Sequence, residues 1–155
     1  DISRFNLHDS IRKTAGALEG VAAKKDIHFD LELSDTEPLW VSGDKDKIQQ
    51  VLHNLMDNAV KFSHEGSSIL ISTREKGNRV FVSVKDSGIG IPKDDLGKIF
   101  ERFYKTDLSR GKDKLGTGLG LSICKEIITA HKQNLDVVST EGVGSEFVFT
   151  LTKET

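Results

Sequence analysis

The sequence predicts an α+β fold, a two-layer α/β sandwich in which helices cover one face of a mixed, mostly antiparallel sheet. Three observations predict it: the apolar periodicity switches between helical and strand spacing, two pairs of strand-like segments are joined by short turns, and helix-like segments separate the pairs. With 155 residues, 36% hydrophobic and 30% charged, the chain resembles one soluble globular domain. A net charge of -2 without a basic block argues against nucleic-acid binding.

The first part of the chain is predicted to form a helix, one or two strands and a second helix. Residues 27–33 alternate strictly between apolar and polar, which is typical of a strand, and residues 38–41 could form another. Asp44 is placed to cap a helix over residues 45–62. The first helix, residues 7–24, is predicted from an apolar stripe of Leu7, Ile11, Leu18, Val21 and Ala22.

The middle of the chain is predicted to form a β-hairpin and a short helix. Residues 68–75 and 79–85 alternate around the turn at residues 76–78, which favours a hairpin. Pro92 follows a glycine-rich turn and is expected to open a short helix that ends near Phe100.

The last part is predicted to contain a loop, a helix and a second hairpin. Residues 104–115 are polar and irregular, a long connection for a compact domain, which indicates a mobile functional loop. Residues 119–131 have helical periodicity. Residues 135–140 and 145–152 read as strands around the turn at residues 141–144.

Neither a membrane span nor a disulfide is expected. The apolar runs are shorter than the ~18 residues of a membrane span, and no signal peptide is visible. The single cysteine, Cys124, lies in an apolar-periodic stretch and is expected to be a buried structural thiol. Because the chain starts abruptly in a helical pattern, we expect it to be excised from a larger protein.

The helix over residues 45–62 carries two stripes. Asn54, Asn58 and Lys61 are spaced i, i+4 and i+7, so they line up beside the apolar stripe. An amide oxygen can supply one ligand to Mg²⁺, and a lysine can offset phosphate charge. Taken alone, this stretch also fits an ordinary amphipathic helix with a solvated polar edge. The apolar stripe comprises Ile48, Val51, Leu52, Leu55, Ala59 and Phe62.

The stretch Asp86-Ser-Gly88-Ile-Gly90 ends a predicted strand. A carboxylate at a strand end can accept a hydrogen bond from the adenine amino group, and glycines allow close approach of the backbone to the base. The alternative is a strand followed by a glycine-rich turn. The metal-binding motif of eukaryotic-type protein kinases does not fit, because the chain has no His-Arg-Asp catalytic loop.

A second glycine-rich stretch, with Gly116, Gly118 and Gly120, leads into the helix over residues 119–131. Main-chain amides at a helix N-terminus favour phosphate. The spacing Gly-x-Gly-x-Gly after a polar loop differs from the Gly-x-Gly-x-x-Gly of dinucleotide-binding folds, and no phosphate-binding loop of the Gly-x-x-x-x-Gly-Lys type is present.

Together these stretches resemble the catalytic, ATP-binding domain of bacterial sensor histidine kinases. That domain has the Bergerat-type ATP-binding fold shared with DNA gyrase, heat-shock chaperones and mismatch-repair ATPases. The resemblance covers nearly the whole chain. Residues 46–63 are similar to the N box of the family, 86–92 to the G1 box, 99–105 to the F box, 116–121 to the G2 box, and 141–147 to the terminal hairpin.

The resemblance implies ATP and Mg²⁺ as cofactors and gives individual residues roles. Asn58 would hold Mg²⁺, Lys61 would reach the phosphates, and Asp86 would bind the adenine amino group. Asn54 and Lys105 would be catalytic, Lys105 as a cation near the phosphates. The other nucleotide contacts would come from Phe62, Gly88, Gly90, Ile91, Gly116, Thr117, Gly118, Leu119, Gly120, Leu121 and Ser145.

The residue at position 54 bears on whether the domain hydrolyses ATP. The gyrase-like relatives carry a glutamate at the position of Asn54, where it acts as general base on water. An amide has no basic lone pair at neutral pH, so ATP hydrolysis by this chain should be slow.

The resemblance also concerns the segments around the last helix. Residues 93–115 would form the mobile ATP lid. After the following helix, the family has His-Gly-Gly where this chain has residues 131–134, so Asn134, or a strained lysine or glutamine, must adopt the left-handed conformation.

The resemblance implies that residues 1–155 form a single catalytic domain. It would donate the γ-phosphoryl of ATP to a histidine on a separate dimerisation domain in two-component signal transduction, with a response regulator downstream. The stretch around His8 only faintly echoes a phosphoacceptor motif and is rejected, because its proline and a second long helix are missing. We expect a cytoplasmic domain of a bacterial membrane sensor, with no nucleic-acid or direct membrane contact. The alternatives are an anti-sigma-type serine kinase and a non-catalytic nucleotide-binding module.

Overall fold

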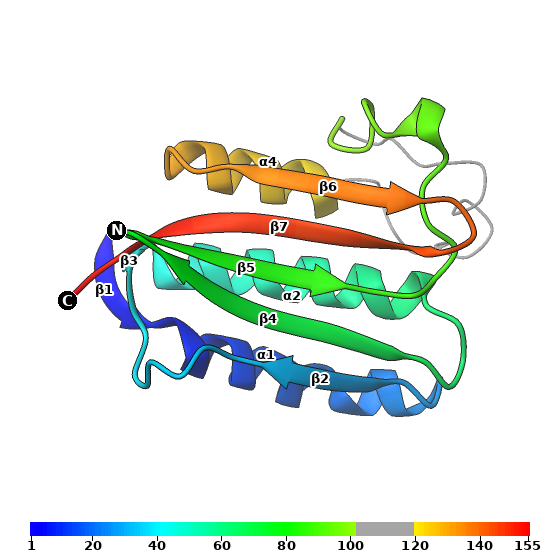
Figure 1. The fold of residues 1–155 in the computed structure, drawn as a ribbon, viewed down its shortest axis with the longest axis horizontal. Coiled ribbons are helices and arrows are strands. Elements are labelled where there is room, and N and C mark those ends of the chain that lie inside the picture. Colours follow the sequence, from blue (N-terminus) through cyan, green and yellow to red (C-terminus); the bar gives the residue numbers. More distant parts are fainter. Residues whose placement is uncertain (102–119) are drawn as a thin grey trace.

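A computed structural model of the chain describes residues 1–101 and 120–155. In this part of the chain, helices α1 (Leu7–Ala23), α2 (Lys45–Phe62) and α4 (Gly120–Ala130) cover one face of a sheet (Figure 1). The predicted two-layer α+β fold is therefore confirmed. The strands are β1 (Ser3–Asn6), β2 (His28–Glu32), β3 (Trp40–Gly43), β4 (Ser68–Lys76), β5 (Arg79–Lys85), β6 (Leu135–Thr140) and β7 (Gly144–Lys153).

The described strands form one mixed sheet in the order β1-β3-β7-β5-β4-β2, and β6 pairs with β7. The pairing is antiparallel except between β2 and β4, which run parallel. Both predicted hairpins, β4–β5 and β6–β7, are present. Strand β7 pairs with β6 over its first half and with β3 at its end, so it ties the two sides of the sheet together.

Helix α2 has the predicted bounds and the predicted cap. The carboxylate of Asp44 accepts a hydrogen bond from the N–H of Lys47 at 3.2 Å, which satisfies one of the free donors at the helix start. The apolar stripe packs against the sheet, except that Phe62 is only half-buried. Because the stripe is fixed, the polar stripe beside it is held at the edge of the helix layer.

Four features of the N-terminal half differ from what the sequence pattern predicts. Strand β1 was not predicted, because it has four residues and one buried side chain, Phe5. Val21 is 48% exposed instead of buried, since the other stripe residues already fill the face of α1 that meets the sheet. Strand β3 begins at Trp40, two residues later than expected. Strand β2 lies at an edge, and its Leu31 is 38% exposed.

The short helix expected from Pro92 to near Phe100 starts where predicted but is shorter and of a different type. The structure has a 3₁₀-helix, η1 (Lys93–Asp95), followed by turns through Phe100. The hydrogen bonds from Leu96 to Lys93 and from Lys98 to Asp95 span three residues, which is typical of 3₁₀ geometry. Gly97 has a low helix propensity, which is consistent with this outcome.

Helix α4 ends in a Schellman motif with a lysine in the left-handed position. The N–H of Lys132 donates to Thr129 at 2.9 Å, and the N–H of Gln133 donates to Ile128 at 3.1 Å. Lys132 has φ of +59°, so the strained lysine, not Asn134, replaces the expected glycine.

Two buried side chains have structural roles. Cys124 is fully buried, and burial raises the pKa of its thiol to about 12, as expected for a structural cysteine. His8 is also fully buried: Nδ1 lies 3.1 Å from Glu37 and Nε2 lies 2.9 Å from Thr73. Neither ring nitrogen of His8 is therefore available as a phosphoacceptor in this fold. None of the described helices is both long and apolar enough to cross a membrane.

Candidate functional site

The described parts of the predicted site meet at one end of the sheet, on the right of Figure 1. Hydrogen bonds from main-chain and side-chain groups join them directly. The N–H of Ile89, after β5, donates to the carbonyl of Phe62 at the end of α2 (3.1 Å). The N–H of Ser145, at the start of β7, donates to Oδ1 of Asp86 (3.3 Å). The amide of Asn54 makes a longer contact of 3.5 Å with the carbonyl of Gly120.

Asp86 is a buried carboxylate, 7% exposed, just after the last residue of β5. Its Oδ1 accepts hydrogen bonds from the N–H groups of Gly88 (2.9 Å) and Ser145 (3.3 Å). Among the described residues both bonds end at Oδ1, so Oδ2 is the oxygen left for a ligand. Burial raises the pKa of Asp86, while the two main-chain hydrogen bonds act in the opposite direction. The site thus fixes the orientation of a carboxylate in a partly desolvated position.

The glycines near Asp86 are required by close backbone contacts within the protein. A Cβ on Gly90, which has φ of +70°, would lie 2.1 Å from the carbonyl oxygen of Thr140. A Cβ on Gly144 would lie 2.2 Å from the carbonyl oxygen of Asp86. Gly88 is equally crowded by Phe62. Close approach of a base was the expected reason for glycine at positions 88 and 90, and the structure gives Gly88 and Gly90 a second reason to lack a side chain.

The polar stripe of α2 lies along the same end of the molecule. Asn54, Asn58, Lys61 and Phe62 are partly exposed, so a ligand can reach them. The ammonium of Lys61 forms an ion pair with Asp57, one turn earlier, at 3.2 Å. This pair has the i, i+4 spacing that favours contact on a helix, so Asp57 was recognisable from the sequence as a partner of Lys61, although it was not predicted.

Ser145 and Ile91 are joined by a residue that the sequence analysis missed, Ser139. The hydroxyl of Ser139 accepts a hydrogen bond from the N–H of Ile91 (2.8 Å) and donates to the carbonyl of Gly144 (3.0 Å). It also lies 2.8 Å from the hydroxyl of Ser145. The hydroxyl of Ser145 is thus already paired with protein. No local sequence pattern marks Ser139, because its partners come from separate segments.

Part of the predicted site lies outside the described residues. This holds for Lys105 and for residues 116–119, which include Gly116, Thr117, Gly118 and Leu119, and for most of the predicted lid. Gly120 is exposed at the start of α4, and Leu121 is partly buried against the core.

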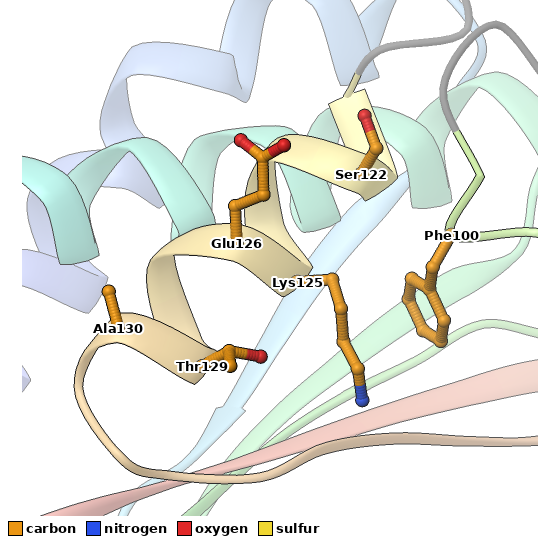
Figure 2. A pocket seen from close by; sticks show the side chains of 6 residues that line it. All are labelled: Phe100, Ser122, Lys125, Glu126, Thr129 and Ala130. Carbon is orange, nitrogen blue, oxygen red and sulfur yellow. The ribbon is translucent and has the colours of Figure 1, made fainter.

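An open pocket of about 430 Å³ lies on the outer side of α4 (Figure 2). Its lining comprises Phe100, Ser122, Lys125, Glu126, Thr129 and Ala130, and includes none of the predicted nucleotide contacts. Lys125 donates to the carbonyl of Leu135 at 2.9 Å, and its ammonium lies 5.2 Å from the centre of the Phe100 ring. This contact joins α4, β6 and the segment before residue 102.

Comparison with known proteins places the chain in a family. A sequence model described as histidine kinase-, DNA gyrase B- and HSP90-like ATPase matches residues 43–155. The chain belongs to this ATPase family. Among curated relatives of the ATPase domain, Sensor histidine kinase WalK of Bacillus subtilis is 45% identical over 127 residues, which is 81% of this chain and 21% of that protein. Sensor protein SrrB of Staphylococcus aureus is 44% identical over 115 residues, covering 74% of this chain and 20% of that protein.

Solved structures agree with this assignment of the ATPase domain. The nucleotide-free catalytic domain of histidine kinase ThkA is 36% identical, with a TM-score of 0.85, and the match covers 99% of this chain and 98% of that one. ThkA in complex with response regulator protein TrrA matches with a TM-score of 0.81 and 34% identity, covering 99% of this chain and 42% of that one. The ATPase domain thus spans about a fifth of the curated relatives and nearly all of an isolated histidine kinase catalytic domain.

Proposed function

We propose that this ATPase domain binds Mg-ATP and donates the γ-phosphoryl group to a histidine on a separate dimerisation and phosphoacceptor domain. The observation that carries the proposal is the buried carboxylate of Asp86, oriented through Oδ1 by the N–H groups of Gly88 and Ser145. A fixed acceptor in a partly desolvated position suits the amino group of adenine, because a buried acceptor gains most from a matched donor.

The residues on α2 suit the charged part of the nucleotide. Asn58 offers an amide oxygen, and Mg²⁺ commonly takes one or two protein oxygens together with phosphate oxygens and water. Lys61 offers a cation for the phosphates, and its ammonium is ion-paired with Asp57 one turn earlier on the helix. When bound, the metal would neutralise charge that develops on the transferred phosphoryl group. Lys105 and the glycines of residues 116–120 complete the proposed site.

The proposed acceptor is a histidine on another domain, not water. Asn54 cannot remove a proton from water at neutral pH, so bound ATP persists until an acceptor is presented. In this chain, both ring nitrogens of His8 are engaged in the core. Sensor histidine kinases among the relatives support a two-component role, with a response regulator as the downstream partner.

The nucleotide site is tested by calorimetric titration of Mg-ATP into the wild type and Asp86→Asn. Asparagine can keep an oxygen at the Oδ1 position, which places its NH₂ group where Oδ2 was, facing the adenine amino donor. We expect the Kd to rise about tenfold to a hundredfold, the loss typical of a hydrogen bond to a charged group. Asp35→Asn, at an exposed position, is the matched control. If the wild type binds no nucleotide, the chain is a non-catalytic module.

The acceptor is tested by mixing the domain with helical-hairpin phosphoacceptor domains and ATP labelled at the γ-phosphate. Acid-labile phosphohistidine on the hairpin domain is the expected product. Acid-stable phosphoserine would instead assign the chain to the anti-sigma-type serine kinases.

The proposal also places the domain in a larger protein. Since the chain spans about a fifth of relatives such as WalK and SrrB, we infer that it is the cytoplasmic catalytic part of a bacterial sensor anchored in the membrane. Expression of the full-length gene followed by membrane fractionation tests this inference.

A further inference from the structure

The ammonium group of Lys25 lies at the C-terminal end of α2. It donates hydrogen bonds to the main-chain carbonyls of Val60 (2.8 Å), Lys61 (3.1 Å) and Ser63 (3.0 Å). Lys25 itself belongs to the turn between α1 and β2, far from these residues in the sequence. Its own carbonyl accepts a hydrogen bond from the N–H of Gly66 at 3.2 Å, so both its main chain and its side chain hold the segment that leaves α2.

These bonds complete the pairing of the last turn of α2. The last four carbonyls of a helix have no partner within the helix. Here the chain leaves α2 in an extended conformation at Ser63, without a left-handed cap. The hydroxyl of Ser63 donates a hydrogen bond to the carbonyl of Ala59 (2.6 Å), and the ammonium of Lys25 donates to the carbonyls of Val60 and Lys61. The last carbonyl, that of Phe62, accepts from the N–H of Ile89 (3.1 Å). The positive charge of Lys25 also opposes the negative end of the helix dipole.

This turn is the part of α2 that carries Lys61 and Phe62. It contacts the turn after β5 through the hydrogen bond between Phe62 and Ile89, and that turn orients Asp86 through Gly88. Loss of the Lys25 ammonium would leave partly buried carbonyls without donors, which favours fraying of the last helical turn. Fraying would displace the phosphate-binding and adenine-binding groups together.

We propose that Lys25 is a positioning residue for the nucleotide: it contacts no part of ATP, and it fixes the helix end that places Lys61 and Phe62 against the turn carrying Asp86. The proposal rests on the proposed function, because it assigns Lys25 to the same ATP site. It differs from a general stabilising role in that the loss of Lys25 should weaken nucleotide binding even where the protein stays fully folded.

The test compares Mg-ATP binding by calorimetry in wild type and Lys25→Met, at a temperature where circular dichroism shows both to be folded. We expect the Kd to rise about tenfold or more, because a frayed helix end loses at least one charge-assisted contact with the nucleotide. Lys25→Arg, which keeps a charged donor, should restore most of the affinity. In the nucleotide-free protein, the amide of Ile89 should exchange with solvent faster in Lys25→Met, because its acceptor has become mobile.

Two control variants separate positioning from charge and from stability. Lys24→Met removes the same charge from the adjacent, exposed position and should leave the Kd unchanged. Ile11→Val removes a methylene group from the core near the start of α1 and should lower stability with little effect on the Kd. If Lys25→Met does not fold, the same titration is made with Lys25→Gln, which keeps N–H donors on a shorter, uncharged side chain.

The outcomes distinguish the two proposals. A wild-type Kd in folded Lys25→Met or Lys25→Gln would overturn the role of Lys25 and leave the proposed function intact. The role of Lys25 would also be overturned if Ile11→Val weakens binding as much as Lys25→Met does, because the effect would then reflect stability. Failure of the wild type to bind Mg-ATP would overturn both proposals.

Discussion

The carbonyl oxygen of Phe62 occupies the space that a side chain at Gly88 would need. A Cβ built on Gly88 would lie 1.9 Å from this oxygen, and the next residue, Ile89, donates its N–H to the same oxygen at 3.1 Å. The end of α2 and the turn after β5 are therefore in direct backbone contact, so their relative position is set by main-chain atoms.

Gly88→Ala should disrupt this contact. Since the neighbour is a backbone carbonyl, which cannot rotate away as a side chain can, we expect a loss of about 2–3 kcal/mol in the free energy of unfolding, together with weaker nucleotide binding. Denaturant titration and calorimetry measure the two effects. Gly97→Ala is the control, because a Cβ there would meet no atom within 4 Å. Wild-type stability in Gly88→Ala would contradict the close approach.

Asp86→Asn should be more stable than the wild type at pH 7 although it binds nucleotide poorly. Burial raises the pKa of Asp86 above its usual 3.8. A carboxyl group whose pKa is higher in the folded than in the unfolded state favours the folded state while it is protonated. This contribution to the free energy of unfolding is complete below the unfolded-state pKa and is lost as the pH rises through the folded-state pKa. The neutral amide avoids this loss. The advantage should disappear below pH 3.8, where the wild-type carboxyl is protonated in both states.

The measurement is the free energy of unfolding of both proteins by denaturant titration at several pH values. Asp35→Asn, exposed, should change stability by less than about 0.5 kcal/mol at pH 7. A variant less stable than the wild type at pH 7 would show that the hydrogen bonds to Asp86 outweigh its burial.

Lys132→Gly should stabilise the protein by about 1 kcal/mol, the approximate cost of the left-handed conformation for a residue with a side chain. Lys132 has φ of +59° and occupies the position that glycine prefers after a helix. Lys132→Ala retains the same strain and should have little effect. Thermal unfolding of the three proteins provides the comparison, and equal stability of the glycine and alanine variants would refute the prediction.

Gly16→Ala and Gly20→Ala should each stabilise α1 by about 0.5–1 kcal/mol, because glycine is a poor residue within a helix. Both glycines are exposed, and a Cβ at either position would meet no atom within 4 Å. Gly90→Ala should have the opposite effect, since its φ is +70° and Thr140 blocks the position. Chemical denaturation distinguishes the signs.

The purified domain should hydrolyse ATP far more slowly than the turnover of about 10 s⁻¹ typical of enzymes. The physical reason is Asn54, which offers an amide where a general base would be needed. Phosphate release in steady state is the measurement, with Asp86→Asn as the control for contaminating ATPase. Rapid hydrolysis that disappears in Asp86→Asn would contradict the kinase assignment.

Local sequence patterns were enough to predict the fold class, both hairpins, the bounds of α2 and the grouping of Asn54, Asn58 and Lys61 on one stripe. These features depend on local periodicity, capping and turn chemistry, which act over a few residues. The resemblance of the five motifs extended this to the family, which the comparisons confirmed. The individual roles of the site residues stay predictions.

Which segments meet, and which residues support the site, follows from the packing of distant parts of the chain. The parallel pairing of β2 with β4 and the short strand β1 depend on contacts distant in the sequence. The same is true of Ser139 and of Lys25, whose ammonium finds its acceptors more than thirty residues away. A single sequence contains both the donors and the acceptors, but it does not show which of them meet. The direction of a side chain and the approach of a second backbone are set only when the layers pack together.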